Sequence, residues 1–408
     1  MMNKTILAAL AAAAALSLGS CAKTTEVVAP SDGLSDGIGF RTFLGATPRA
    51  AEYSVASSMK TDGFNVLAFG NNAQYFSDTA KPETATPDGT GKWETQTGSY
   101  VWPGFKLDFY AYANLPTDNT ATINTTKKEI SLKTQDKVAD QKDAVVAYKK
   151  EATKEVYETS GAPLYFKHIL SQVTVEAKDA NQSTHPYKIE VAGVKIGHVN
   201  SVATFTFPDA TTAEGTALAS SLYTNGGTAK DFVAGSSSIV ELTSTAQTIM
   251  NSTNGNFMLI PQDLTAWDPT AQWKDENTDG TNDVTSPAYD NGVFLGVLVR
   301  IKTTGGAAIY PTDGTKFAFA TTPLNIDKFE PGKKYKITVD FANGAGFEEP
   351  AANTVSPTDL PTGVTVNNSP ITPATPGKPI LGGPIKFTVT VQDWADGGTT
   401  EVNMTPAE

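Results

Sequence analysis

Residues 385–392 read Ile–Lys–Phe–Thr–Val–Thr–Val–Gln, the most regular alternation of apolar and polar side chains in this chain. Successive side chains of a β-strand point to opposite faces, so the four apolar residues share one face and the four polar residues share the other. This stretch predicts a β-strand with one buried face. It can pair within its own fold or add to a sheet of a neighbouring molecule.

The rest of the chain repeats this signal less regularly. Short apolar runs separated by Gly, Pro, Asn and Asp predict further strands, while long amphipathic helix patterns are scarce. The predicted strands are Phe64–Phe69, Leu107–Tyr112, Leu164–Ala177, Tyr187–Val199, Ala203–Phe207, Phe257–Ile260, Val293–Ile301, Phe317–Phe319 and Tyr335–Phe341. Val293–Ile301 is almost wholly apolar, which predicts a central strand covered on both faces. The charge-dense residues 127–158 predict a long loop or a short solvated helix. An all-β fold built of β-sandwiches follows.

The N-terminus carries a targeting signal. Lys4 precedes an alanine-rich apolar run, Ile6–Leu16, which has the length of a signal h-region and is too short to span a bilayer. The run leads into Leu18–Gly19–Ser20–Cys21, which resembles the lipobox of bacterial lipoprotein precursors. We therefore expect residues 1–20 to be removed and Cys21 to carry lipid, including palmitate. The alternative is an ordinary secretory signal beside a stray cysteine.

Cysteine content and net charge exclude several classes of function. Cys21 is the only cysteine, so a lipidated chain has no thiol left for disulfides, zinc–thiolate sites or nucleophilic catalysis. The chain has 31 Lys and Arg against 43 Asp and Glu, a net charge of −12. This acidity argues against nucleic acid and anionic membrane surfaces as partners.

The segment after Cys21 combines a tether, a strand and a basic residue. Residues 22–37 are small and polar, as in a flexible tether. Ile38–Leu44 then alternates as a half-buried strand, and Pro48 ends the pattern. The bond between Arg49 and Ala50 lies in the turn that follows, where a protease could reach it. The alternative for Arg49 is an ordinary surface arginine.

Proline dominates the approach to the C-terminus. Residues 350–384 hold eight of the 24 prolines, which predicts a semi-rigid extended spacer. Two candidate strands follow it. The first has its apolar face at Ile385, Phe387, Val389 and Val391, and the second is a short alternation at Thr400, Val402 and Met404.

The sequence contains few residues in arrangements suited to catalysis or metal binding. His168, His185 and His198 lack the spacing of a metal pair and are predicted to be structural. One acidic loop places oxygen ligands at alternating positions, as a Ca²⁺ site needs, at Asp275, Asn277, Asp279 and Asp283. Ser286 stands where a bidentate acid would complete that site, and the same residue types also dominate ordinary turns. No firm metal site, no cofactor and no enzymatic activity are predicted, with Ca²⁺ as the open alternative.

Several segments together resemble the fimbrillin family of Bacteroidales, the subunits of type V pili. The resemblance covers nearly the whole mature chain and lies in the order of its motifs. They are the lipobox at Cys21, Phe40–Thr42, Arg49–Ala50, Tyr100–Pro103, Leu107–Tyr112, Phe166–Val173, Phe257–Gln262 and Phe329–Thr338.

The resemblance implies an architecture and an assembly mechanism. It implies two transthyretin-like β-sandwich domains in tandem, at residues 50–183 and 184–349, after a prosegment at 21–49 and before a C-terminal region at 350–408. The lipoprotein precursor would be held at the outer membrane and cut between Arg49 and Ala50 by an arginine-specific surface protease. Loss of strand Ile38–Leu44 would open a groove for the C-terminal strand of the next subunit. The family pattern places that donor at Thr399–Met404, whereas the alternation alone favours Ile385–Val391.

The expected function is thus a structural subunit of a surface fimbria that supports adhesion, most simply a shaft subunit. Its partners would be further copies of itself and the anchor and tip subunits. A tip or anchor subunit is one alternative. Another is a glycan-binding surface lipoprotein that uses Trp267 and Trp273 for stacking, and a hydrolase is the third.

Overall fold

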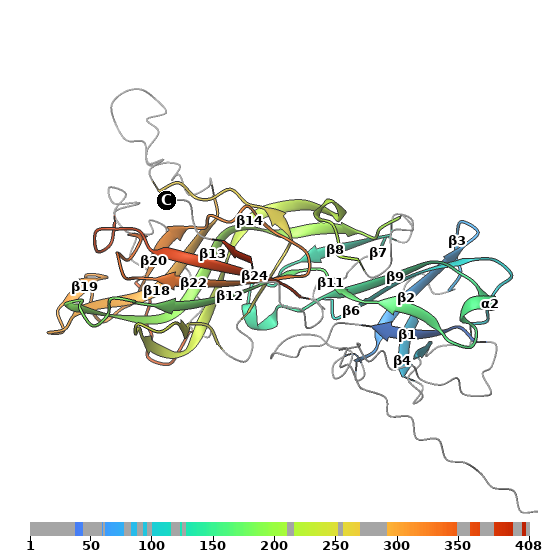
Figure 1. Cartoon of the computed structure of the whole chain (residues 1–408), viewed down its shortest axis with the longest axis horizontal. Helices are drawn as coiled ribbons and strands as arrows, with labels where there is room; N and C mark the ends of the chain where they lie inside the picture. Colours follow the sequence, from blue (N-terminus) through green and yellow to red (C-terminus); the bar gives the residue numbers. More distant parts are fainter. Residues whose placement is uncertain are drawn as a thin grey trace, which may run out of the picture.

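The computed structural model describes residues 37–43, 59, 62–76, 83–87, 93–95, 100–115, 123–124, 128–209, 216–251, 256–269, 292–348, 360–367, 379–394 and 402–404. Two β-rich units lie end to end along the long axis of the molecule (Figure 1). The all-β prediction is confirmed, since the described residues include only short helical pieces: α2 (Lys154–Tyr157), the 3-10 turns η2 (Val138–Asp140) and η3 (Ser220–Leu222), and the helical residues Met59 and Asp62. No helix in the described ranges is both long and apolar enough to cross a membrane.

The first unit is formed by one sheet that curls around its own core. Its neighbour order is β10 (Ala162–Tyr165), β1 (Gly39–Phe43), β5 (Trp93–Thr95), β4 (Glu83–Pro87), β2 (Phe64–Gly70), β6 (Leu107–Ala113), β9 (Val145–Ala152) and β11 (Lys167–His168), with β3 (Ala73–Gln74) paired to β2. Alternate residues of β6, Phe109 and Ala111, point into this core together with Phe40 and Phe64.

The second unit is a sandwich of two sheets. One has the order β15 (Gln247–Thr248), β12 (Ser171–Lys178), β22 (Lys333–Asp340), β24 (Lys386–Asp393) and β25 (Val402–Met404), with β16 (Phe257–Leu259) on β12. The other has the order β23 (Phe347–Glu348), β20 (Ala318–Pro323), β18 (Phe294–Thr303), β13 (Tyr187–Thr206), β8 (Glu129–Lys133) and β7 (Ile123–Asn124), with β14 (Tyr223–Glu241) on β13 and β19 (Ala308–Tyr310) on β18. A short ribbon pairs β17 (Gln262–Asp263) with β21 (Lys328–Phe329).

The core of this sandwich confirms the prediction of a central strand at Val293–Ile301. β18 lies between β13 and β20, and Leu295, Val297 and Val299 are completely buried between the two sheets. Burial of such side chains stabilises the fold by roughly 1.5–3 kcal/mol each. A strand with both sides paired and its side chains covered needs apolar residues along its whole length.

A third apolar cluster joins the two units. Tyr110 and Tyr112 of β6 lie on the opposite face from Phe109 and Ala111, point away from the first core, and pack with Phe205 of β13 and with Trp394. Burial raises the pKa of the Tyr112 phenol well above its ordinary value. Because β6 is apolar on both faces, the first unit is built to be covered on its outer side.

Two features qualify the predicted domain limits. β12 lies before residue 184, yet Val173 and Val175 belong to the core of the second unit and β12 pairs in parallel with β22. We propose that the boundary between the two units lies near Ser171, where the apolar core changes, and not at the predicted division 183/184. The proline-rich spacer, where described, runs along the second unit: Val366 bridges to Phe317, and Ile380 is buried in the core.

The prediction for residues 127–158 is wrong. That stretch contains β8 and β9, and α2 is a single turn. The burial pattern of β9 explains the error, because Val145–Tyr148 is buried whereas Lys149 and Lys150 are half-buried and Glu151 is exposed. The high charge density predicted a solvated element, although β9 is a strand that is buried along more than half of its length.

Candidate functional site

The first candidate site is the seat of β1 in the sheet of the first unit. β1 lies between two strands from distant parts of the sequence, pairing in parallel with β10 and antiparallel with β5. It carries a buried face, with Ile38 at 3% and Phe40 at 0% exposure, which agrees with the predicted alternation. The segment is therefore an interior strand of its sheet although it stands near the start of the chain.

Aromatic packing fixes the inner face of β1. The Phe40 ring meets the Phe109 ring edge-on, with centroids 5.0 Å apart and planes at 89°, and lies 6.1 Å from the Phe64 ring. Such aromatic pairs stabilise beyond the area that they bury, by about 0.5–1.5 kcal/mol. If β1 left, Phe109 and Phe64 would face an open groove.

Polar contacts and one glycine fix the edges of β1. The Trp93 indole Nε1 donates to Thr42 Oγ1 at 2.8 Å, and the Arg41 guanidinium donates to the Gly161 carbonyl at 3.4 Å. Gly161 has φ of +73°, and a Cβ there would lie 3.1 Å from the Phe40 carbonyl carbon and 3.2 Å from Gly39. Glycine at this position allows β1 to approach β10 closely.

The second candidate site is the C-terminal end of the chain. β24 pairs antiparallel with β22 over eight residues, from Lys386 opposite Asp340 to Asp393 opposite Lys333. Phe387 and Val389 are buried in the second core, which confirms the predicted alternation. In this structure β24 is thus an integral strand of its own sandwich.

The chain is anchored again where β24 ends. The backbone N–H of Trp394 donates to the Gly332 carbonyl at 2.7 Å, and the indole stacks on the His168 ring with centroids 4.3 Å apart. His168 Nδ1 is in turn 2.8 Å from Asp143 Oδ1, and both side chains are buried. This agrees with the structural role predicted for His168.

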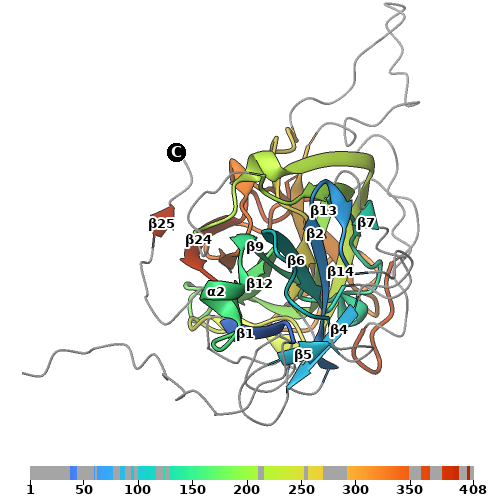
Figure 2. The same cartoon turned by 90° about the vertical axis from the view of Figure 1, so that its right-hand side faces the viewer.

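β25 lies outside β24 and is the edge of its sheet among the described strands. It pairs through Val402 opposite Val391 and Met404 opposite Val389. Figure 2 shows β25 at the periphery of the molecule, beside β24. The two predicted donor segments thus occupy different positions, one inside the sheet and one at its edge.

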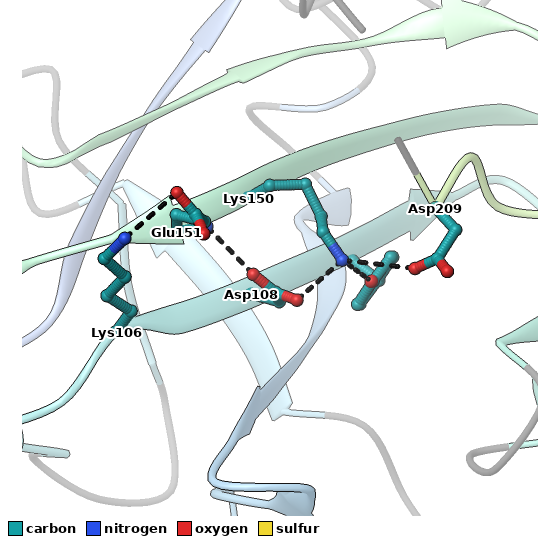
Figure 3. Close-up of polar contacts among 6 residues, drawn as sticks. Lys106, Asp108, Lys150, Glu151 and Asp209 are labelled. Atoms are coloured by element: carbon teal, nitrogen blue, oxygen red, sulfur yellow. Dashed lines mark hydrogen bonds and ion pairs between the residues drawn. The ribbon is translucent and has the colours of Figure 1, made fainter. Parts of the chain in front are cut away.

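A third candidate is a polar hollow where the first unit meets the residues that flank β8 and β13, with a volume of about 820 Å³. Charged side chains from β6 and β9 line it together with Lys106, Lys128 and Asp209, as Figure 3 shows for most of them. The Lys150 ammonium donates to Asp108 at 2.6 Å and to the Tyr110 hydroxyl at 2.9 Å, and lies 3.5 Å from Asp209. Burial acts to lower the pKa of Lys150, but the hydrogen bonds to Asp108 and Tyr110 outweigh it and raise that pKa. Lys150 remains charged.

Comparison with known proteins now adds an independent observation. The fimbrillin-like family model matches residues 49–368. The chain belongs to the fimbrillin-like family. No curated protein matches the chain at a significant level.

Solved structures similar to this fimbrillin-like chain share little of its sequence. A fimbrial protein from Bacteroides vulgatus is 15% identical, with 74% of this chain and 94% of that chain covered and a TM-score of 0.44. A fimbrilin from Porphyromonas gingivalis is 11% identical, with 89% and 98% covered and a TM-score of 0.42.

Several predicted site residues of this fimbrillin-like chain lie outside the described residues. They are the lipidation site Cys21, the processing site Arg49 and Ala50, the donor candidate Thr400, Trp273, and the calcium candidates Asp275, Asn277, Asp279 and Asp283. These remain predictions. In the ranges that the structure describes, no group of three or more His, Cys, Asp or Glu side chains could hold a metal ion.

One predicted residue has a different role from the one considered. Trp267 is 4% exposed and packs edge-on against Phe347 and against Phe294. It therefore has no free ring face for a sugar, and the glycan-binding alternative that rests on Trp267 is not supported. The polar hollow could not be predicted from the sequence because its side chains come from separate segments spread between Phe69 and Asp209.

Proposed function

We propose that this fimbrillin-like chain is a non-enzymatic structural subunit of a cell-surface fimbria, joined to its neighbours by exchange of strands. The observation that carries the proposal is the position of β1, an N-terminal strand that fills the interior of a sheet formed by later segments. Removal of such a strand leaves unpaired backbone groups on β10 and β5 and an apolar groove beside Phe109. A strand from another subunit satisfies both.

The donor in this proposal is the C-terminal edge, with Val402 and Met404 of β25. β24 contributes Phe387 and Val389 to its own core and is anchored by Trp394, so its departure would open the second unit. β25 adds three residue pairs at a sheet edge and can leave at lower cost. In this proposal the apolar face of β24 stays with its own sandwich, at Ile385, Phe387, Val389 and Val391. The donor is the segment that the family pattern matches, Thr399–Met404.

Acceptor and donor lie on different units of the molecule. β1 belongs to the first unit and β24, which carries β25, to the second (Figure 1). A head-to-tail contact between two different surfaces does not close on itself and so extends into a filament. A chain with both surfaces can grow at both ends, which supports a shaft subunit over a tip or anchor subunit.

The precursor in this scheme is an outer-membrane lipoprotein held through Cys21. An arginine-specific protease at the cell surface would cut between Arg49 and Ala50 and release the tether together with β1. Until that cut, β1 occupies the groove and prevents assembly. The partners are further copies of the chain and the anchor and tip subunits.

Incubation of the purified precursor with an arginine-specific protease tests the proposal. We expect Ala50 as the new N-terminus and a ladder of oligomers on unboiled gels. The matched control is Arg49→Gln, which keeps the length of the segment and should stay monomeric under the same treatment. A cut at Ala50 with no oligomers would refute strand exchange, and oligomers in uncut Arg49→Gln would refute the role of processing.

A further inference from the structure

The polar hollow has no part in the proposed strand exchange. Its described lining comes from the β2–β3 hairpin, from Lys106 and Asp108, from Lys128, from Lys150 and Glu151 of β9, and from Asp209, whereas β1, β24 and β25 contribute no residue to it. Its volume of about 820 Å³ lies within the range of ligand pockets, roughly 300–1,000 Å³.

A β-bulge between β6 and β9 forms the floor of this hollow. Leu107 pairs with Ala152 and Phe109 with Lys149, so Lys150 and Glu151 together stand opposite the single residue Asp108. Consecutive residues of a regular strand point to opposite faces, but here both Lys150 and Glu151 line the hollow. Glu151 has φ of +52°, and its N–H donates to Asp108 Oδ1 at 2.8 Å, which holds the bulge in place. Bulges often serve to redirect a side chain toward a site.

The charges of the described lining cancel, and most of them are paired within the hollow. The lining holds three lysines and three carboxylates. Lys106 pairs with Glu151 at 3.1 Å, and Lys150 bonds Asp108. The Lys128 ammonium lies over the Tyr110 ring, 5.0 Å from its centroid. An ion entering this hollow would meet as many like charges as opposite ones, so the charge pattern favours an uncharged ligand.

The rim adds groups that both donate and accept hydrogen bonds. Asn71 and Asn72 form the two-residue turn between β2 and β3, with φ of +49° and +62°, and both side chains are exposed. Each amide offers two N–H donors and one carbonyl acceptor. The Asp209 carboxylate is 92% exposed and adds further acceptor oxygens.

We propose that this hollow binds a neutral oligosaccharide. Hydroxyl groups of a sugar donate and accept at once, so they match the interleaved amides, carboxylates and ammonium groups. The ion pairs are already formed before the ligand arrives, which keeps the donors and acceptors fixed and lowers the cost of ordering them. The subunit would then carry a glycan-binding site along the side of each copy.

A glycan array carrying neutral, sialylated and sulfated oligosaccharides tests the inference with the purified full chain. The test variant combines Asn72→Gly with Asp209→Ala. Glycine keeps the left-handed turn at position 72, and Asp209 is exposed, so the fold and its melting temperature should be unchanged. The matched control is Asp136→Ala, which removes an exposed carboxylate paired with Lys230 at 2.7 Å and absent from the lining of the hollow.

The expected result is retention of at least one neutral glycan by the wild type and by Asp136→Ala. Affinity should fall at least about tenfold in the double variant, which corresponds to about 1.4 kcal/mol. Three outcomes overturn the inference: no glycan retained by the wild type, retention of sialylated or sulfated glycans alone, or equal binding by the double variant. The assay needs no cleavage or polymerisation, so its outcome is independent of strand exchange.

Discussion

The indole of Trp394 lies parallel to the imidazole of His168, with an interplanar angle of 5° and ring centroids 4.3 Å apart. This stack joins the residue that follows β24 to a strand of the first unit. It lies where the two units meet, in the same apolar cluster as Tyr110 and Phe205. β24 is thereby tied to its own molecule at its end as well as along its length.

Replacement of Trp394 should therefore destabilise the chain. Trp394→Ala removes a large buried side chain, and we expect a loss of about 3–5 kcal/mol in the free energy of unfolding. Trp394→Phe is the matched control: it keeps a ring over His168 and removes an indole N–H that has no hydrogen-bond partner among the described residues. That variant removes fewer buried atoms, so it should cost clearly less than Trp394→Ala. Urea unfolding measures both, and equal effects of the two changes would contradict the role assigned to the stack.

Two C-terminal truncations should differ in their effect on the stability of the second unit. Deletion of residues 395–408 removes β25 and leaves β24 paired with β22, so the melting temperature should change little while assembly after cleavage is lost. Deletion of residues 385–408 also removes Phe387 and Val389 from the core and should unfold the second unit. Thermal melts followed by the gel assay separate these outcomes. Polymers formed by the shorter deletion would show that β25 is not the donor.

Gly161 should tolerate no side chain while β1 is in place. Gly161→Ala forces a left-handed backbone onto an L-residue and crowds Phe40 and Gly39, so we expect a loss of about 1–3 kcal/mol. Gly104→Ala serves as the control, because a Cβ at Gly104 meets nothing within 4 Å. Chemical unfolding of the uncut precursor compares the two. The account of the β1–β10 contact fails if Gly104→Ala is the more damaging change.

Burial of Tyr112 predicts loss of stability at alkaline pH. Burial raises its pKa above the ordinary value of 10.0, so the folded state keeps the phenol neutral when the unfolded chain ionises it. A group with a raised folded-state pKa contributes stability that is complete below its unfolded pKa and is lost as the pH rises toward the folded value. The free energy of unfolding should fall above pH 10.0, by up to about 1.4 kcal/mol per pH unit for this group.

Tyr112→Phe isolates that contribution. The difference between the variant and the wild type should be constant at pH 8 and pH 9, where the phenol is neutral in both states, and should shift in favour of the variant above pH 10.0. Urea midpoints at each pH measure it. A difference that does not change with pH would show that Tyr112 ionises equally in the folded and unfolded chain.

Local pattern predicted the strands well where one or both faces are buried. The alternation at 385–392 became β24, and the apolar run at 293–301 became β18, since burial alone fixes both patterns. Pairing partners could not be predicted in this way. That β24 lies beside β22, and β1 between β10 and β5, depends on contacts between distant segments.

The polar hollow shows more clearly what local sequence pattern cannot predict. It exists because Lys150 and Glu151 face Asp108 across a bulge, and a bulge is a property of the register between two strands. In the sequence Lys150 and Glu151 are part of the charged stretch 127–158, whose composition predicts solvated surface. The paired Asn71–Asn72 turn was the one local signal at this site, and it indicates a hairpin, not a ligand.

The intact mass of the subunit sheared from the cell surface tests the central claim most directly, because it reports lipid, processing site and C-terminus together. If β1 must leave before the fimbria can grow, the mass will equal that of residues 50–408 without lipid. A mass that includes residues 21–49 with lipid on Cys21 would show that β1 stays in place in the assembled fimbria, and would contradict the account.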